Sequence, residues 1–106
     1  MANTFKNYFA ANVGTTANTV LTATTATTVI GCSIANKTSA AITASVQVNS
    51  SSVDYYLIKD APILSGGSLI PVGGEQKLVL ENGDSFKVTS NTASSVDVIV
   101  SVLEIS

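Results

Sequence analysis

The sequence predicts an all-β protein, an antiparallel β-sandwich of about seven strands with a short N-terminal arm. Residues branched at Cβ (Val, Ile and Thr) make up about a third of the 106 residues, and such branching favours strands over helices. Apolar and polar residues alternate in several segments, as they do in half-buried strands. Turn-forming residues separate these segments about every ten to twelve positions, a spacing typical of sandwiches and barrels.

The expected strands follow one another from residue 19 to the end of the chain. The first half holds Thr19–Thr22, Thr28–Ala35, Ile42–Val48 and Val53–Ile58. The second half holds a short edge strand within Ser65–Gly74, then Gln76–Leu80, Ser85–Ser90 and Ser95–Ile105. The short link 36–40 makes the second and third of these strands a candidate hairpin. Pro62 should end the fourth, because proline cannot donate to a strand ladder.

Asn82 and Gly83 lie between two alternating segments, Gln76–Leu80 and Ser85–Ser90. Asn-Gly in that position is a strong signal for a tight hairpin turn. We therefore expect this turn to set the register of the two strands and to direct four side chains into the core, those of Leu78, Leu80, Phe86 and Val88. The neighbouring carboxylates Glu81 and Asp84 are expected to be solvated turn groups and not catalytic acids or ion ligands.

Residues 1–17 differ from the sandwich domain, residues 18–106, because they concentrate aromatic side chains at Phe5, Tyr8 and Phe9. The spacing of Phe5 and Phe9 suits a short helical turn. Aromatic residues near a terminus could equally clamp onto the parent domain or onto a neighbouring subunit.

The last strand, Ser95–Ile105, is apolar on both faces. Valines occupy one face, and Ile99, Leu103 and Ile105 occupy the other. Strands with this pattern are covered on both sides, and a two-sheet sandwich provides only one inner layer. The second face therefore needs the N-terminal arm or another subunit as its cover. We expect an interface made of Phe5, Tyr8, Phe9, Ile99, Leu103 and Ile105.

The composition points away from catalysis, metal binding and nucleic-acid binding. The chain has no His, its five basic residues are all Lys, and its formal net charge is −2, so it lacks the usual general base and the charge that phosphate binding needs. Cys32 is the only cysteine and is expected to be an inert core thiol. We expect no catalytic residue, cofactor or metal, no membrane span and no export signal.

One alternative binding function comes from Tyr55 and Tyr56, which lie beside Lys59 and Asp60. Aromatic rings of this kind can form a platform on which sugars stack. The alternation predicts that the two tyrosines lie on opposite faces, so the competing interpretation places one in the core and the other at a subunit contact.

Several segments of residues 28–106 resemble small virion structural proteins of tailed bacteriophages. The resemblance is carried by Asp54–Ile63, Gly67–Leu69, Gly73–Leu80, Gly83–Ser85 and Ser95–Ile105. It implies a non-enzymatic β-sandwich present in many copies in the virion. The leading expectation is a capsid decoration or cement protein that contacts the major capsid protein and itself, with a trimer as the first guess. A tail, neck or fibre component and a carbohydrate-binding host-recognition module are the alternatives.

Overall fold

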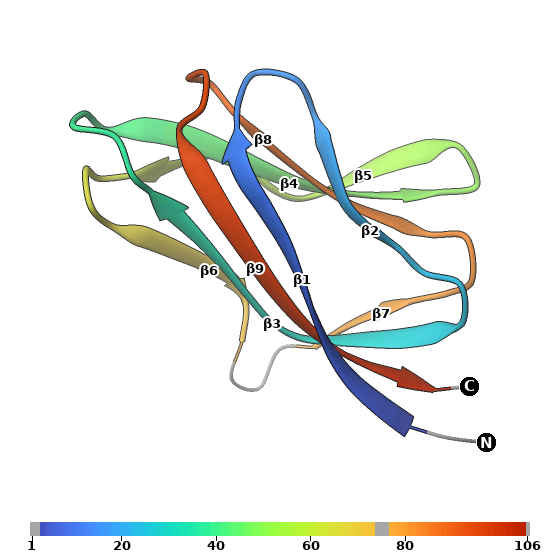
Figure 1. The fold of residues 1–106 in the computed structure, drawn as a ribbon. Coiled ribbons are helices and arrows are strands. Elements are labelled where there is room, and N and C mark those ends of the chain that lie inside the picture. The colour runs from blue at the N-terminus through green and yellow to red at the C-terminus, as the bar shows by residue number, and fades with distance from the viewer. Residues whose placement is uncertain (1–2, 74–76, 106) are drawn as a thin grey trace.

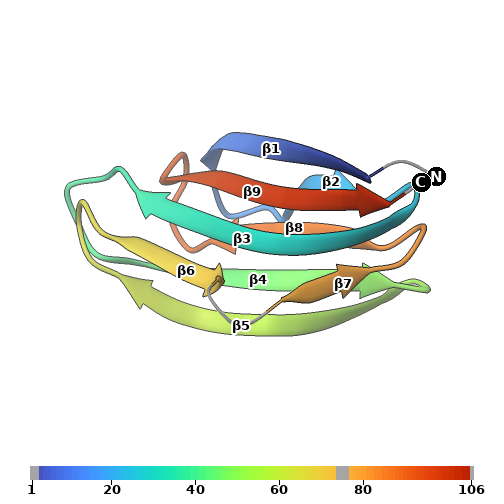
Figure 2. The same ribbon diagram turned by 90° about the horizontal axis from the view of Figure 1, so that it is seen from below.

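The computed structural model describes residues 3–73 and 77–105 and contains two β-sheets packed face to face (Figures 1 and 2). No helix occurs in these residues, and all strand pairs are antiparallel. The predicted antiparallel β-sandwich is confirmed, with nine strands in the described residues where about seven were expected. The strands are β1 (Asn3–Val13), β2 (Asn18–Thr22), β3 (Ala26–Asn36), β4 (Ile42–Ser50), β5 (Val53–Ile63), β6 (Ser68–Val72), β7 (Leu78–Leu80), β8 (Ser85–Ser90) and β9 (Val96–Ile105).

The larger, five-stranded sheet has the order β1-β9-β3-β6, with β7 also paired to β3. The smaller, four-stranded sheet has the order β2-β8-β4-β5. In Figure 2, β1, β9 and β3 of the larger sheet lie above β4 and β5 of the smaller sheet. The first and last strands are neighbours, because Asn3 pairs with Ile105, and this pairing brings the two ends of the chain together.

The core lies between the sheets and is formed by alternate residues of the strands. On β9 all four valines are at most 1% exposed, and Phe86 of β8 faces them from the other sheet with no exposed surface. Burying such side chains contributes about 1.5–3 kcal/mol each. The largest fully buried side chains are Val13, Val29, Ile34, Val46, Val72, Leu80, Phe86, Val88, Val96, Val98, Val100 and Val102.

Most of the expected arm is strand β1, which pairs with β9 along the edge of the larger sheet. The short helical turn considered for residues 3–12 is therefore wrong. Residues four apart share a face in a strand as well as in a helix, so the spacing of Phe5 and Phe9 suits both. Pairing with β9 favours the strand over the helical turn, because the backbone N–H and C=O groups along one side of β1 then form hydrogen bonds with β9.

Two expected hairpins are also wrong, because each short link crosses from one sheet to the other. β3 and β4 lie in different sheets, as do β7 and β8. In the first link, the buried Asn36 side chain donates to the carbonyl groups of Ala40 (2.8 Å), Ile63 (3.1 Å) and Leu64 (3.2 Å). Its Oδ1 accepts from the Thr38 backbone N–H at 2.9 Å. These bonds replace the ladder that a hairpin would have formed.

The second link is a turn across residues 81–84, where the backbone N–H of Asp84 donates to the Glu81 carbonyl at 2.9 Å. Gly83 has φ of 97°, as the third residue of a type II turn requires. Asp84 is only 9% exposed, and its Oδ2 accepts from the Glu81 backbone N–H at 3.0 Å. The expectation that Asp84 is solvated is therefore wrong. Gly74 and Gln76, which bound two of the expected strands, lie outside the described residues.

β5 continues through Pro62, although proline was expected to end this strand. Pro62 pairs in register with Thr43, and β5 is the last strand of the four-stranded sheet. An edge strand has one side without ladder bonds, so it tolerates a residue that lacks an N–H. The strand also bends, because its register with β4 shifts around Val46 and Asp60 has φ of 51°.

Candidate interaction surface

The outer face of the five-stranded sheet carries rows of exposed apolar side chains. Phe5 lies beside Leu103 on the neighbouring strand, Leu103 lies beside Thr28, and Thr28 lies beside Val79. This row crosses four strands. Phe5 is 73% exposed and Val79 is 64% exposed, so nothing in the described chain covers either end of the row.

A second row crosses the same face closer to the other end of the strands. Phe9 lies beside Ile99, which in turn lies beside Ser33. Phe9 is 68% exposed and Ile99 is 47% exposed. Between the two rows, Ser101 Oγ donates to Asn7 Oδ1 at 2.7 Å. We use the term apolar face for this set of outward side chains of β1, β9, β3 and β7: Phe5, Asn7, Phe9, Thr28, Ser33, Val79, Ile99, Ser101, Leu103 and Ile105, with Asp97 at the rim.

Five of the six predicted interface residues belong to the apolar face: Phe5, Phe9, Ile99, Leu103 and Ile105. The sixth, Tyr8, pairs with the buried Val100 and packs against the core from the opposite side of β1. Its hydroxyl donates to Glu104 Oε2. This hydrogen bond raises the pKa of Tyr8, and partial burial and the Glu104 charge raise it further.

Sequence reasoning placed Leu78 and Leu80 in the core but did not place Val79 on this face. Alternation along the segment already implied that Val79 points away from the two leucines. Nothing in the sequence indicated that β7 pairs with β3, and this pairing is what carries Val79 to the same face as Phe5.

The three long strands β1, β9 and β3 contribute one charged side chain to the apolar face, that of Asp97, at its rim. Asp97 Oδ1 lies 2.9 Å from Lys37 Nζ and accepts from the Asn12 backbone N–H at 3.1 Å. The hydrogen bond from Lys37, followed by that from Asn12, lowers the pKa of Asp97. The other charged residues of these strands, Lys6 and Glu104, lie on the inward side. Lys6 Nζ lies 3.6 Å from Glu104 Oε1.

The outer face of the four-stranded sheet is polar by comparison. Lys87 Nζ lies 3.6 Å from Asp54 Oδ1, and Asn49 Nδ2 donates to the same oxygen at 2.8 Å. The bond from Asn49 and the charge of Lys87 together lower the pKa of Asp54. Thr22 and Ser85 share a further hydrogen bond of 3.0 Å. The two outer faces of the sandwich therefore differ sharply in chemistry.

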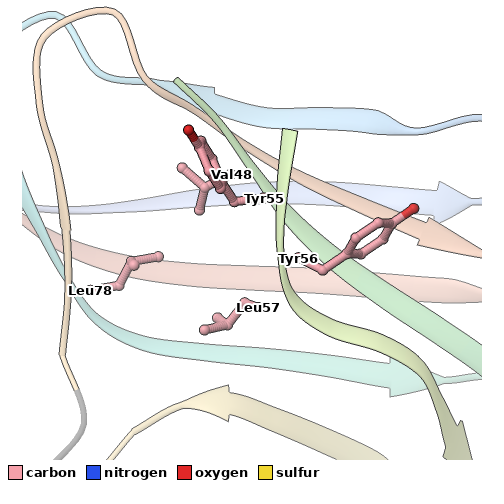
Figure 3. Close-up of a pocket in the computed structure, with 5 residues that line it drawn as sticks. All are labelled: Val48, Tyr55, Tyr56, Leu57 and Leu78. Carbon is pink, nitrogen blue, oxygen red and sulfur yellow. The ribbon is translucent and has the colours of Figure 1, made fainter. Parts of the chain in front are cut away.

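A small apolar pocket of about 240 Å³ opens between the sheets beside β5 (Figure 3). Val48, Tyr55, Leu57 and Leu78 converge on it, whereas the Tyr56 ring points away. Both tyrosine rings are more than half exposed. Because they face different sides of β5, the two rings do not form a shared platform for a sugar.

Groups that could carry chemistry are sparse in residues 3–73 and 77–105. They contain no cluster of three or more Cys, Asp or Glu side chains arranged to hold a metal ion. Cys32 is 3% exposed, and burial raises its pKa to about 12, so the thiol stays protonated near neutral pH. No helix in this part of the chain is long and apolar enough to cross a membrane.

Comparison with models of known protein families gave no match, and a search of curated proteins found no similar sequence. The fold and the surface together define a class: a β-sandwich with one apolar and one polar outer face. This arrangement allows the apolar face to be buried against another protein surface.

Proposed function

We propose that this chain is a non-enzymatic structural protein of a bacteriophage virion, and specifically a capsid decoration protein that docks on the shell through its apolar face. The observation that carries the proposal is the exposure of Phe5, Phe9 and Ile99 on one continuous, nearly uncharged sheet face. The assignment to a phage particle rests on the sequence resemblance described above.

The energetics of exposure support a docking role for this face. Leaving an aromatic side chain in water instead of burying it forgoes about 1.5–3 kcal/mol. Phe5 and Phe9 are each about two-thirds exposed or more, and they are joined by aliphatic neighbours on β9. Contiguous apolar patches of this kind typically mark protein interaction sites. The proposed partners are other copies of this chain and the major capsid protein, with no role for nucleic acid or a membrane.

A position in the tail, neck or fibre would use the same face in the same way, and it is the second candidate within this class. A glycan-binding function would have to rest on Tyr56 alone, whose ring lies 5.1 Å from Lys59 Nζ, or on Tyr55 at the pocket. No paired aromatic platform favours it.

The docking proposal is tested by binding purified chain to capsids from which the protein has been omitted. Ile99→Lys places a charge in the middle of the apolar face, where 47% of the side chain is already exposed, so folding should be retained. We expect this variant to lose most capsid binding and the associated gain in particle stability. Thr22→Lys adds the same charge at an exposed position of the polar outer face, opposite the uncharged Ser85, and should bind normally. Equal binding by both variants would contradict docking through the apolar face.

A further inference from the structure

Strand β1 presents a sheet edge that is regular over its first eight residues. It ends the five-stranded sheet, and its register with β9 is uninterrupted from Asn3 to Ala10. This stretch contains no proline and a single charged residue, Lys6. Natural proteins usually protect such edges against pairing with another chain by proline, bulges or charges.

β5, one of the two edge strands of the other sheet, carries several of these protective features. It contains Pro62, two shifts of register against β4 and the charged residues Lys59 and Asp60. β1 has a shift of register only after Ala10, so the stretch from Asn3 to Ala10 lacks the proline and the register shifts that protect β5 and offers an edge with which another strand can pair.

The sequence of β1 identifies that strand. Residues 5–9 read Phe-Lys-Asn-Tyr-Phe, a nearly palindromic pattern centred on Asn7. Antiparallel pairing with a second β1 about Asn7 places Phe5 opposite Phe9 of the second copy on the apolar face. Aromatic pairs directly across two strands stabilise a sheet by about 0.2–1 kcal/mol each.

On the inward side, the same register places Lys6 opposite Tyr8 of the second copy. That tyrosine is hydrogen-bonded to Glu104, so each lysine meets an acidic neighbourhood across the pair. At the centre, Asn7 lies opposite itself. Its Oδ1 accepts from Ser101 at 2.7 Å, and its amide N–H groups can donate to the other Asn7. Each side of β1 is thus complementary to the same side of β1 in a second copy.

We propose that two copies of this chain associate through antiparallel pairing of their β1 strands about a two-fold axis at Asn7. The pairing joins the two five-stranded sheets into one continuous sheet and doubles the apolar face while leaving it open. It therefore replaces the trimer expected from the sequence with a dimer. The inference concerns the edge of the sheet and does not depend on the docking role of its face or on a phage origin.

The register is tested by disulfide cross-linking of the purified chain under mild oxidation. Paired residues in a sheet have Cα atoms about 4.5–5.5 Å apart, within the range that a disulfide spans. Asn7→Cys should cross-link to itself. Phe5→Cys should not, because two copies of residue 5 would be four positions apart, about 13 Å along the strand. A mixture of Phe5→Cys and Phe9→Cys chains should cross-link to each other.

Cys32 serves as the internal control, because its buried thiol should not react in the folded protein. Self-cross-linking of Phe5→Cys as efficient as that of Asn7→Cys, or failure of Asn7→Cys to cross-link, would overturn the proposed register.

The association itself is tested by sedimentation equilibrium. Asn7→Asp keeps the acceptor for Ser101 but places two carboxylates opposite each other at the axis, where like charges destabilise strand pairing. We expect the dissociation constant of the dimer to rise roughly tenfold or more, and high salt to reverse part of the loss. Asn82→Asp makes the same change on the exposed turn far from the edge and should leave the dimer intact. A strictly monomeric or trimeric wild-type chain, or equal effects of the two variants, would refute the proposal.

Discussion

Replacing Asn36 with alanine should destabilise the fold more than any surface change, because one buried amide holds the crossing between the two sheets. Asn36 is 2% exposed. Its Nδ2 donates to three backbone carbonyls at 2.8–3.2 Å. Its Oδ1 accepts from the backbone N–H and the hydroxyl of Thr38 at 2.9 Å and 2.8 Å.

The size of the stability loss in Asn36→Ala depends on whether water can reach the former hydrogen-bond partners of Asn36. The hydrogen bond to the Ile63 carbonyl is buried, and an unsatisfied buried group costs about 1–3 kcal/mol. The other four bonds are only partly buried, so each contributes about 0.5 kcal/mol. The expected loss is therefore about 3–5 kcal/mol, against about 5–15 kcal/mol for the total stability of a domain.

Urea denaturation of the wild type, Asn36→Ala and Asn36→Asp at several pH values provides the assay. In Asn36→Asp, the ionised carboxylate would face three carbonyl oxygens, which raises its pKa in the folded state above the unfolded value of about 3.9. The penalty of this variant should be smallest below pH 4 and should grow as pH rises through the folded pKa. The penalty of Asn36→Ala should not show this growth with pH. Parallel pH profiles for the two variants, or a loss below about 1 kcal/mol in Asn36→Ala, would refute the reasoning.

Four further predictions concern single sites. Gly83→Val should lower the free energy of unfolding by about 1–3 kcal/mol in thermal melts, because Gly83 has φ of 97°. The space around Gly83 is open, so Gly83→Ala should lose about as much stability as Gly83→Val. No loss in either variant would contradict backbone strain at this position. Asp84→Ala should cost about 1 kcal/mol by removing the acceptor of the Glu81 N–H, and Asp84→Asn should cost less because its Oδ1 can still accept. The Cys32 thiol should resist alkylation at pH 8 until the protein unfolds, since burial raises its pKa to about 12; rapid labelling of the native protein would contradict its placement in the core. The pKa of Asp97 is lowered in the folded state, so Asp97→Asn should destabilise the protein slightly above the unfolded pKa of about 3.9 and not well below the folded pKa, and denaturation at pH 2 and pH 7 measures the difference.

The class of fold and the inward residues of β8 and β9 could be predicted from the sequence alone. Alternation placed the valines of β9 and Phe86 of β8 in the core, and the structure confirms both. The placement of Ile99, Leu103 and Ile105 on the opposite side of β9 could also be predicted. These features are local, because a period of two fixes which side chains share a face wherever the strand is placed.

Which strands are neighbours could not be predicted from the local pattern. A short link with turn residues between two strands suggests a hairpin, but the Asn36 and Gly83 links cross between sheets. β1 became a strand, with Phe5 beside Leu103 and Phe9 beside Ile99, through its pairing with β9. Strand pairing joins residues that are distant in sequence, and its free energy comes from burying both inner faces together. The local pattern therefore specifies the faces of the strands, and the packing of the whole chain selects their partners.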